Sequence, residues 1–319
     1  MRSPAGSSSL MTSSSRRVRW GMKIRRRKRV VLALGAGGAR GLAHLGVIRA
    51  LKEAHIPIDA VAGVSFGAII GALYCLYGDV NALEKRLKEY MNSPAFQETR
   101  KGMASWDAEK PNSFLEKIQA TIKKGYFYTV ALSRKSLLTP ESFIMNIYGL
   151  MGETTFDELK IPFKCQAVDL VTGQPVVFSE GDLCTAVQAS SAVPGFFPPV
   201  LMKGMQMVDG GVAEMIPIHL AKTFEPDYLI GVDVRKQIEP LADPDKDLGH
   251  SFDVVFRSYD ITRDFMDIYL AKELDTVICP DLGSHSWYDF DHFETYIRQG
   301  YEAAKAKVPE LKRRIYWLY

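Results

Sequence analysis

The stretch Ala60–Gly67 reads Ala-Val-Ala-Gly-Val-Ser-Phe-Gly and places Ser65 in the pattern G-x-S-x-G. A short apolar run precedes the serine, and a helical run, Phe66–Tyr77, follows it. A serine between a strand and a helix needs a sharp turn, in which Gly63 and Gly67 leave room where a side chain would clash. The turn presents the hydroxyl at the tip of the strand, next to the positive end of the helix dipole. The pattern therefore indicates a nucleophilic serine, although an ordinary tight turn fits the same five residues.

A glycine-rich loop lies upstream of this turn. The loop Gly35–Gly41 reads Gly-Ala-Gly-Gly-Ala-Arg-Gly and connects a buried strand predicted at Val30–Leu34 to a helix predicted from about Ala39 to His55. Backbone N–H groups at the start of such a helix point toward a bound anion. Because the carboxyl ends of parallel strands share one edge of a sheet, we expect the loop and the Ser65 turn to lie side by side.

The loop suits two functions at this point. One is an oxyanion hole, in which the amides of Gly37, Gly38 and Ala39 stabilise negative charge on a carbonyl oxygen. The other is dinucleotide binding, since the loop opens like G-x-G-x-x-G, but Arg40 stands where the third glycine is needed. Asp59 lies near the distance expected of a ribose-binding acid, which keeps the nucleotide interpretation open.

Composition describes an ordinary globular protein with an uneven charge distribution. The chain has 319 residues, 47% hydrophobic and 24% charged, which suits one large α/β domain or two small ones. Residues 1–29 contain ten basic and no acidic residues, which leaves 30 basic and 37 acidic residues from Val30 onward. A mildly acidic body argues against nucleic-acid binding. We expect residues 1–29 to be a disordered tail without a secretory h-region, and a polybasic contact with anionic membranes is the alternative interpretation.

The cysteines indicate a reducing, cytoplasmic location. Cys75, Cys165, Cys184 and Cys279 lie far apart and resemble small buried hydrophobes. The longest apolar run, Phe66–Gly78, is too short to span a bilayer, so membrane contact would be peripheral. Neither the cysteines nor the six histidines show zinc-ligand spacing, and we expect no metal and no other cofactor.

Residues 93–152 differ from the rest of the chain in sequence pattern and composition. Predicted helical segments alternate with irregular pieces that are rich in aromatic residues and methionine. We interpret this region as a helical cap insertion that lines an acyl-chain pocket, because methionine and aromatic side chains form adaptable apolar surfaces. Plain packing of helices on the sheet is the alternative.

A candidate base lies farther along the chain. Asp209 precedes Gly210 and Gly211 at the end of a predicted strand, and the rigid loop Ser191–Pro199 is expected to form a wall of the site. A carboxylate near Ser65 can accept its proton directly, most effectively when burial raises its pKa. A Ser–Asp–His triad would instead use a downstream histidine, of which there are four: His219, His250, His285 and His292. None of these four lies in a turn motif that would present it to a site.

Taken together, four blocks resemble the patatin-like phospholipases. They are Gly37–Gly41, Gly63–Gly67, Ala189–Pro194 and Asp209–Gly211, and the resemblance extends over about residues 30–217. It implies a three-layer α/β/α hydrolase with a mostly parallel central sheet and a Ser–Asp dyad without a catalytic histidine.

The resemblance also implies a role for each matching residue. Ser65 becomes the nucleophile and Asp209 the base. The oxyanion hole is assigned to Gly37, Gly38, Ala39 and Arg40, with Arg40 orienting the loop. The motif glycines that support the two turns are Gly63, Gly67, Gly210 and Gly211.

The predicted function is a serine lipid acyl hydrolase whose hydrolase domain spans residues 30–319. Its substrate is a lipid or lies on a membrane surface. Two differences between this sequence and the family pattern leave the substrate open among phospholipid, lysophospholipid, triacylglycerol and simple ester. Residues Glu214–Pro217 lack the asparagine that the family often has before the proline, and the cap carries nothing diagnostic. The alternatives are a catalytically weak regulatory or lipid-binding relative, or a nucleotide-binding protein that uses the Gly35–Gly41 loop. The oligomeric state is left unpredicted.

Overall fold

The computed structural model describes residues 27–104, 136, 140–236, 238–244, 248–249, 251–283, 285 and 287–316. The predicted tail lies outside these residues except for its last three positions. Most of the predicted cap, residues 105–135 and 137–139, also lies outside them, so the cap as a whole remains a prediction.

A mixed sheet forms the centre of the described part of the chain. Its strands are β1 (Val30–Leu34), β2 (Ala60–Gly63), β3 (Phe163–Asp169), β4 (Pro175–Phe178), β5 (Val200–Met202), β6 (Met205–Asp209), β7 (Tyr228–Val232) and β8 (Thr276–Ile278). The order is β5-β6-β3-β2-β1-β7-β8, with β4 paired to β3. The strands β3, β2, β1, β7 and β8 run parallel, whereas β4, β5 and β6 form antiparallel pairs. The predicted mostly parallel sheet is confirmed, and β3 and β4 form an antiparallel hairpin beside it.

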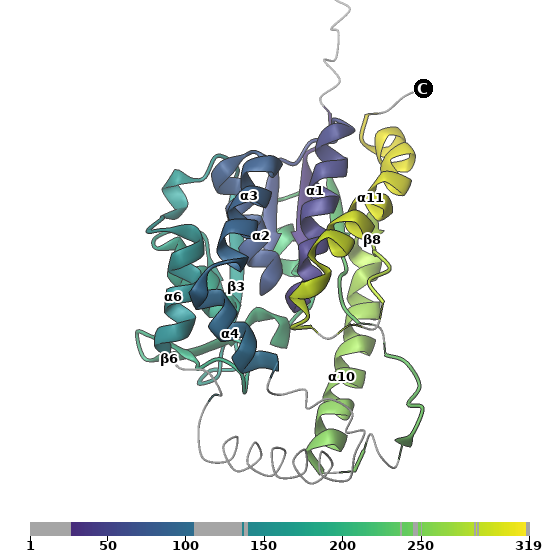
Figure 1. Ribbon diagram of the computed structural model, residues 1–319. Coiled ribbons are helices and arrows are strands. Elements are labelled where there is room, and N and C mark those ends of the chain that lie inside the picture. Colours follow the sequence, from purple (N-terminus) through teal and green to yellow (C-terminus); the bar gives the residue numbers. More distant parts are fainter. Residues whose placement is uncertain are drawn as a thin grey trace, which may run out of the picture.

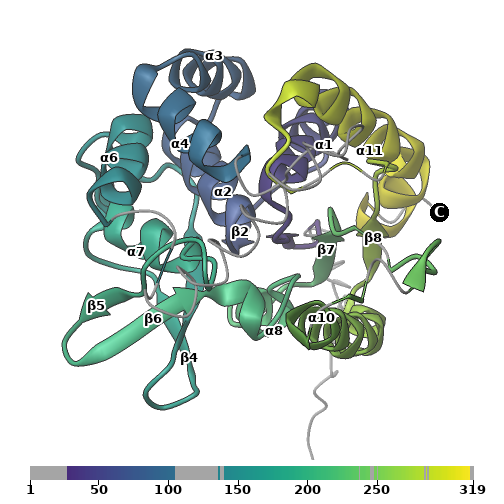
Figure 2. The same ribbon diagram turned by 60° about the horizontal axis from the view of Figure 1, so that its bottom comes forward.

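The helices lie on both faces of this sheet (Figures 1 and 2). They are α1 (Ala43–Glu53), α2 (Phe66–Tyr77), α3 (Val80–Met91), α4 (Pro94–Ala104), α6 (Pro140–Met151), α7 (Leu183–Ser190), α8 (Ile218–Lys222), α10 (Ser251–Leu270) and α11 (Phe293–Tyr316). Short 3₁₀ turns occur at Gly38–Leu42, Phe156–Glu158, Gly210–Val212, Ala271–Glu273 and Phe290–His292. The predicted helix after the glycine-rich loop thus begins with a 3₁₀ turn, and its α-helical part starts at Ala43.

Strand β1 shows how the sequence produces three layers. All five of its residues are buried, which is typical of a parallel strand covered on both faces. Because side chains alternate across a strand, Val30, Leu32 and Leu34 pack in the core with α1, α2 and α11. The intervening Val31 and Ala33 pack on the opposite face, with α8 and the end of α10. Figure 2 shows these two helical layers on either side of the sheet. The predicted three-layer α/β/α fold is confirmed.

The helices α1 and α11 touch through their backbones. A Cβ atom added to Gly46 would lie 1.8 Å from the carbonyl oxygen of Ile297, and one added to Gly300 would lie 2.0 Å from the carbonyl oxygen of Ala43. Only glycine permits such an approach at both positions. The last helix is therefore fixed against the helix that follows the glycine-rich loop.

The burial expected of the four cysteines is found for three of them. Cys75, Cys165 and Cys184 are buried free thiols, as expected, whereas Cys279 is exposed because it follows β8 at the edge of the sheet.

Among the described residues, no helix is both long enough and apolar enough to cross a membrane.

Candidate active site

Ser65 occupies a strained turn between β2 and α2. Its φ of 55° and ψ of −128° are rarely adopted by a residue with a side chain, and such strain costs about 1–3 kcal/mol. Neighbouring serines hold the turn in place. The Ser65 N–H donates to the carbonyl oxygen of Ser190 at 3.0 Å, and the Ser191 hydroxyl donates to the carbonyl oxygen of Ser65 at 3.2 Å. Strained backbone held by specific hydrogen bonds is characteristic of functional sites.

The two motif glycines give this turn the room that the sequence predicts. A Cβ atom on Gly63 would lie 2.6 Å from Cα of Ala68, and one on Gly67 would lie 2.2 Å from the carbonyl oxygen of Leu34. The helix α2 therefore starts directly against the end of β1. This contact brings Ser65 beside the loop that follows β1.

Asp209 reaches the same edge of the sheet through the register of β6. Strand β3 pairs with β2 at Cys165 and with β6 at Ala167, two residues nearer the carboxyl edge, where Asp209 lies opposite. A Cβ atom on Gly210 would lie 2.5 Å from Cγ2 of Val64, the residue before Ser65. The turn that carries the candidate base thus contacts the turn that carries the candidate nucleophile.

The carboxylate of Asp209 is held inside the protein. Its side chain is only 4% exposed, and Oδ1 accepts a hydrogen bond from the Gly211 N–H at 2.7 Å. Burial raises the pKa of Asp209 to about 6, and the hydroxyl of Ser65 and the amide of Gly211 act in the opposite direction. Within the described residues, Oδ2 is buried without a hydrogen bond of ordinary geometry. Catalytic hydrogen bonds are often loose before substrate binds, and Oδ2 is the oxygen left to receive a proton.

The glycine-rich loop lies beside Ser65 and Asp209, and one of its amides already donates a hydrogen bond within the protein. Gly38 has a φ of +57°, and a Cβ atom there would lie 2.2 Å from the carbonyl oxygen of Trp287. The Ala39 N–H donates to that same carbonyl at 2.5 Å, so the Ala39 amide has a protein acceptor. The amides of Gly37 and Gly38 are the remaining candidates for the oxyanion hole, and Gly37 itself packs tightly against Val234.

Two charged or titratable side chains brace this loop. Arg40 is 7% exposed and its Nη1 donates to the carbonyl oxygen of His285 at 3.2 Å, while burial lowers the pKa of the guanidinium. His44 is fully buried and its Nε2 lies 2.8 Å from the carbonyl oxygen of Gly35. Burial lowers the pKa of His44 to about 4, so the ring is neutral at pH 7 and Nε2 carries the hydrogen that this carbonyl accepts.

An apolar cavity of about 100 Å³ opens beside Ser65 and Gly38. Its walls come from α2, α3, α4, α6 and the segment before α11, and they include Phe66, Ile69, Leu87, Phe96, Leu150, Trp287 and Phe290. The predicted wall loop also contributes, through Ser191, Val193 and Phe197. The cavity has the polarity expected for an acyl chain whose ester group lies at Ser65.

The histidine and nucleotide alternatives find no support in the described geometry. His219 contacts Glu214, and His285 and His292 both face Asp289, while His250 lies outside the described residues. Asp59 accepts hydrogen bonds from Arg27 and from the Val30 N–H, at the amino end of β1. The glycine-rich loop follows the carboxyl end of β1, so Asp59 cannot reach a ribose bound there.

Two residues of the site were not predicted from the sequence. His44 lies nine residues beyond the carbonyl that it contacts, inside a helical pattern where a histidine carries no signal. Trp287 lies 248 positions beyond Ala39, and only the fold brings its carbonyl to the loop.

Fold and site together define an α/β/α protein with a strand–serine–helix turn of the type that displays nucleophiles in hydrolases. The family model of the patatin-like phospholipases matches residues 32–222. The chain belongs to the patatin-like phospholipase family.

Several curated proteins are similar to this chain. Neuropathy target esterase sws of Drosophila melanogaster is 28% identical over 208 residues, which are 65% of this chain and 13% of that protein. Lysophospholipase nte1 of Aspergillus fumigatus is 30% identical over 64% of this chain and 12% of its own length. An uncharacterized NTE family protein of Mycobacterium tuberculosis is 31% identical over 64% of this chain and 48% of its own length. The matched segment covers less than half of each relative.

Two bacterial proteins are among the solved structures that are similar to this chain. VipD from Legionella pneumophila has a TM-score of 0.49 and 14% identity, covering 89% of this chain and 67% of VipD. ExoU from Pseudomonas aeruginosa, solved in the ExoU–SpcU complex, has a TM-score of 0.41 and 17% identity, covering 91% and 52%.

Proposed function

We propose that this chain is a serine lipid acyl hydrolase that cleaves carboxylic esters through Ser65 and Asp209. The observation that carries the proposal is the position of Ser65, which stands in a strained turn at the mouth of an apolar cavity and adjoins a buried carboxylate. The match to the patatin-like phospholipase model supports the same reaction class.

The reaction follows from the positions of these groups. The Ser65 oxygen attacks the ester carbonyl while its proton passes to Asp209, and the amides of Gly37 and Gly38 stabilise the negative oxygen. Collapse of the intermediate expels the alcohol, which takes the proton from Asp209. Water then attacks the acyl-enzyme while one of its protons passes to Asp209. Collapse of this second intermediate breaks the bond between the acyl group and Ser65, whose oxygen takes the proton back from Asp209, and the fatty acid is released. With a pKa of about 6, Asp209 is ionised at pH 7–8 and yet basic enough to take a proton.

Lysophospholipids are the substrate class that we propose. The cavity at Ser65 is apolar, which favours lipids over small polar esters. A relative that is 30% identical is described as a lysophospholipase, and a single-chain lipid leaves its polar part outside such a cavity.

The test compares esters and variants of the full chain. We expect hydrolysis of lysophosphatidylcholine and of p-nitrophenyl esters, and covalent labelling of Ser65 by a fluorophosphonate. Ser65→Ala should abolish all three signals, and Asp209→Asn should abolish turnover. The exposed Ser179→Ala and Asp227→Asn are matched controls that should retain activity. Full turnover by Ser65→Ala would exclude the proposal, and absence of labelling would favour a regulatory or lipid-binding relative.

We propose further that the chain is cytoplasmic and meets lipid at a membrane surface. The basic residues 1–29 would contact anionic lipid, at about 1 kcal/mol for each cation near the surface. Sedimentation with liposomes that contain phosphatidylserine tests this contact. The full chain should sediment more than a variant that begins at Met22, which lacks four of the ten basic residues, and equal sedimentation would remove residues 1–21 from the proposed contact.

A further inference from the structure

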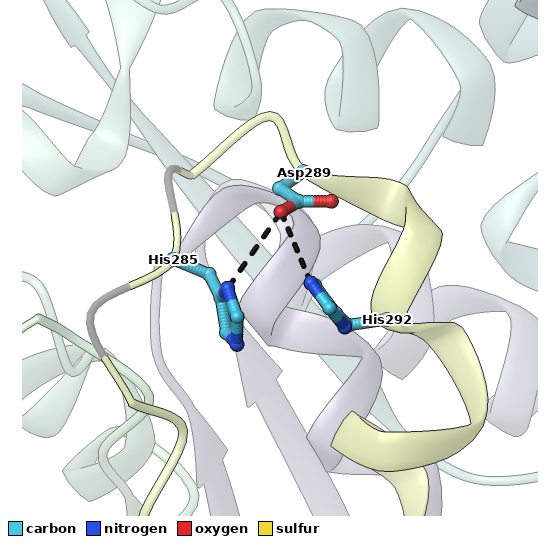
Figure 3. Close-up of side chains that lie close together, drawn as sticks. All are labelled: His285, Asp289 and His292. Atoms are coloured by element: carbon cyan, nitrogen blue, oxygen red, sulfur yellow. Dashed lines mark ion pairs between the residues drawn. The ribbon is translucent and has the colours of Figure 1, made fainter.

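Three side chains just before α11 converge on one point. His285, Asp289 and His292 offer ligand atoms that all lie within 4.8 Å of one another. Nδ1 of His285 lies 3.7 Å from Oδ2 of Asp289, and Nε2 of His292 lies 3.4 Å from the same oxygen. Figure 3 shows both ring nitrogens directed at this oxygen.

These separations are long for hydrogen bonds and suitable for a shared cation. An N–H···O bond is about 2.7–3.2 Å long, and both N···O distances exceed this range. A tetrahedral zinc ion with ligands at about 2.0–2.1 Å places neighbouring ligand atoms roughly 3.3 Å apart. The two measured distances lie close to that edge length.

The surroundings hold these ligands in orientation. The imidazole rings of His285 and His292 lie with their centroids 3.8 Å apart, and the ring of Tyr296 meets both of them edge-on. Oδ1 of Asp289 accepts a hydrogen bond from the Asp291 N–H at 3.1 Å, which leaves Oδ2 facing the histidines. Such a supporting bond to a carboxylate ligand is typical of metal sites.

We propose that His285, Asp289 and His292 form a binding site for a divalent transition metal, for which Zn²⁺ is the best match. Two imidazoles and one carboxylate are a donor set that suits zinc, whereas calcium and magnesium prefer oxygen ligands alone. The three side chains are 40%, 27% and 39% exposed, so an ion can enter from solvent and water can supply a fourth ligand.

A metal ion at this site would fix the segment before α11, which also borders the glycine-rich loop. The carbonyl oxygen of His285 accepts from Arg40, and that of Trp287 accepts from the Ala39 N–H. Trp287 and Phe290 line the apolar cavity. The ion would therefore act by positioning this wall, and it takes no part in the ester chemistry.

This site was not predicted from the sequence. The ligands follow H-x₃-D-x₂-H, in which a carboxylate lies between the histidines, and this differs from the cysteine and histidine spacings of structural zinc sites. The expectation of no metal depended on those spacings.

The experiment measures zinc binding to the untagged full chain after treatment with chelator. Competition with a chromophoric chelator should give one strong site per chain. His285→Gln and His292→Gln should each weaken binding by at least about tenfold, and the double variant should abolish it. His219→Gln is the matched control, because His219 also contacts a carboxylate, that of Glu214, and should leave zinc affinity unchanged.

Two further measurements keep the result unambiguous. Bound Co²⁺ should show the visible absorption of a tetrahedral site without a sulfur charge-transfer band, which excludes the exposed thiol of Cys279 as a ligand. Circular dichroism should show that the glutamine variants are folded. Zinc affinity that persists in the folded double variant, or no binding at about 100-fold molar excess of zinc, would overturn the proposal.

Discussion

Replacing Asp209 by asparagine should make the protein more stable while it removes the proposed activity. Asparagine keeps an oxygen that can accept from the Gly211 N–H, but it carries no charge in the buried site. The folded-state pKa of Asp209 is about 6, above its usual value of 3.8, because burial disfavours the charged form. The folded state therefore binds the proton more tightly than the unfolded state does.

The pH dependence of this effect has a definite sign. Below about pH 3 the carboxyl is protonated in both states, and the charge makes no contribution to the free energy of unfolding. Between about pH 4 and pH 6 only the unfolded state ionises, so stability falls as pH rises. Above about pH 7 the buried charge lowers the free energy of unfolding by a constant amount. A pKa raised from 3.8 to about 6 corresponds to a loss of about 3 kcal/mol.

Urea unfolding of wild type and Asp209→Asn at pH 4, 5, 6, 7 and 8 measures the difference directly. The advantage of the variant should grow by about 2.4 kcal/mol from pH 4, where the unfolded carboxyl is already partly ionised, to pH 7 and then remain level. The control is Asp59→Asn. Burial tends to raise the pKa of Asp59, but hydrogen bonds and charge from Arg27 lower it overall, so the deficit of that variant should already be present at pH 4 and stay nearly constant to pH 8. A pH-independent difference for Asp209→Asn would refute the buried, pKa-shifted carboxylate.

Three other predictions concern the site and its support. The rate of ester hydrolysis should fall below about pH 6 as Asp209 is protonated, and Arg263→Gln should move this midpoint upward, because the Arg263 charge lowers the pKa of Asp209; a pH–rate profile checks both. Gly300→Ala should destabilise the protein by about 1–3 kcal/mol or more through its collision with α1, whereas Gly149→Ala in α6, which meets nothing within 4 Å, should be neutral or stabilising in urea unfolding. Leu150→Trp should shorten the preferred acyl chain by filling the cavity, and a series of p-nitrophenyl esters would contradict this by showing an unchanged preference.

The sequence predicted the parts of the site that depend on local geometry. The turn at Ser65 follows from glycines at fixed offsets between an apolar run and a helical run, and each of these glycines proves to touch backbone. The hairpin of β3 and β4 and the turn at Asp209 are likewise local patterns. Such features can be predicted because sterics within a few residues decide them.

The parts that the sequence missed depend on contacts between distant residues. Asp209 was expected near Ser65, but its route there, through a strand antiparallel to β3, depends on a register that no local pattern shows. The carbonyl of Trp287 at Ala39 and the convergence of His285 with His292 also require α11 to be in place. Asp59 lay at a suitable distance along the chain for a ribose ligand but at the wrong end of β1.

The backbone contact between α1 and α11 bears on how much of the chain is needed for an active protein. The family model matches residues 32–222, yet Gly46 and Gly300 hold α1, the helix after the glycine-rich loop, against α11, which begins at Phe293. A fragment that ends at residue 222 would keep all residues that the family model matches, but it would expose to water the side of α1 that contacts α11. We expect such a fragment to lack the proposed activity, because the folded unit extends well past the residues that the family model matches.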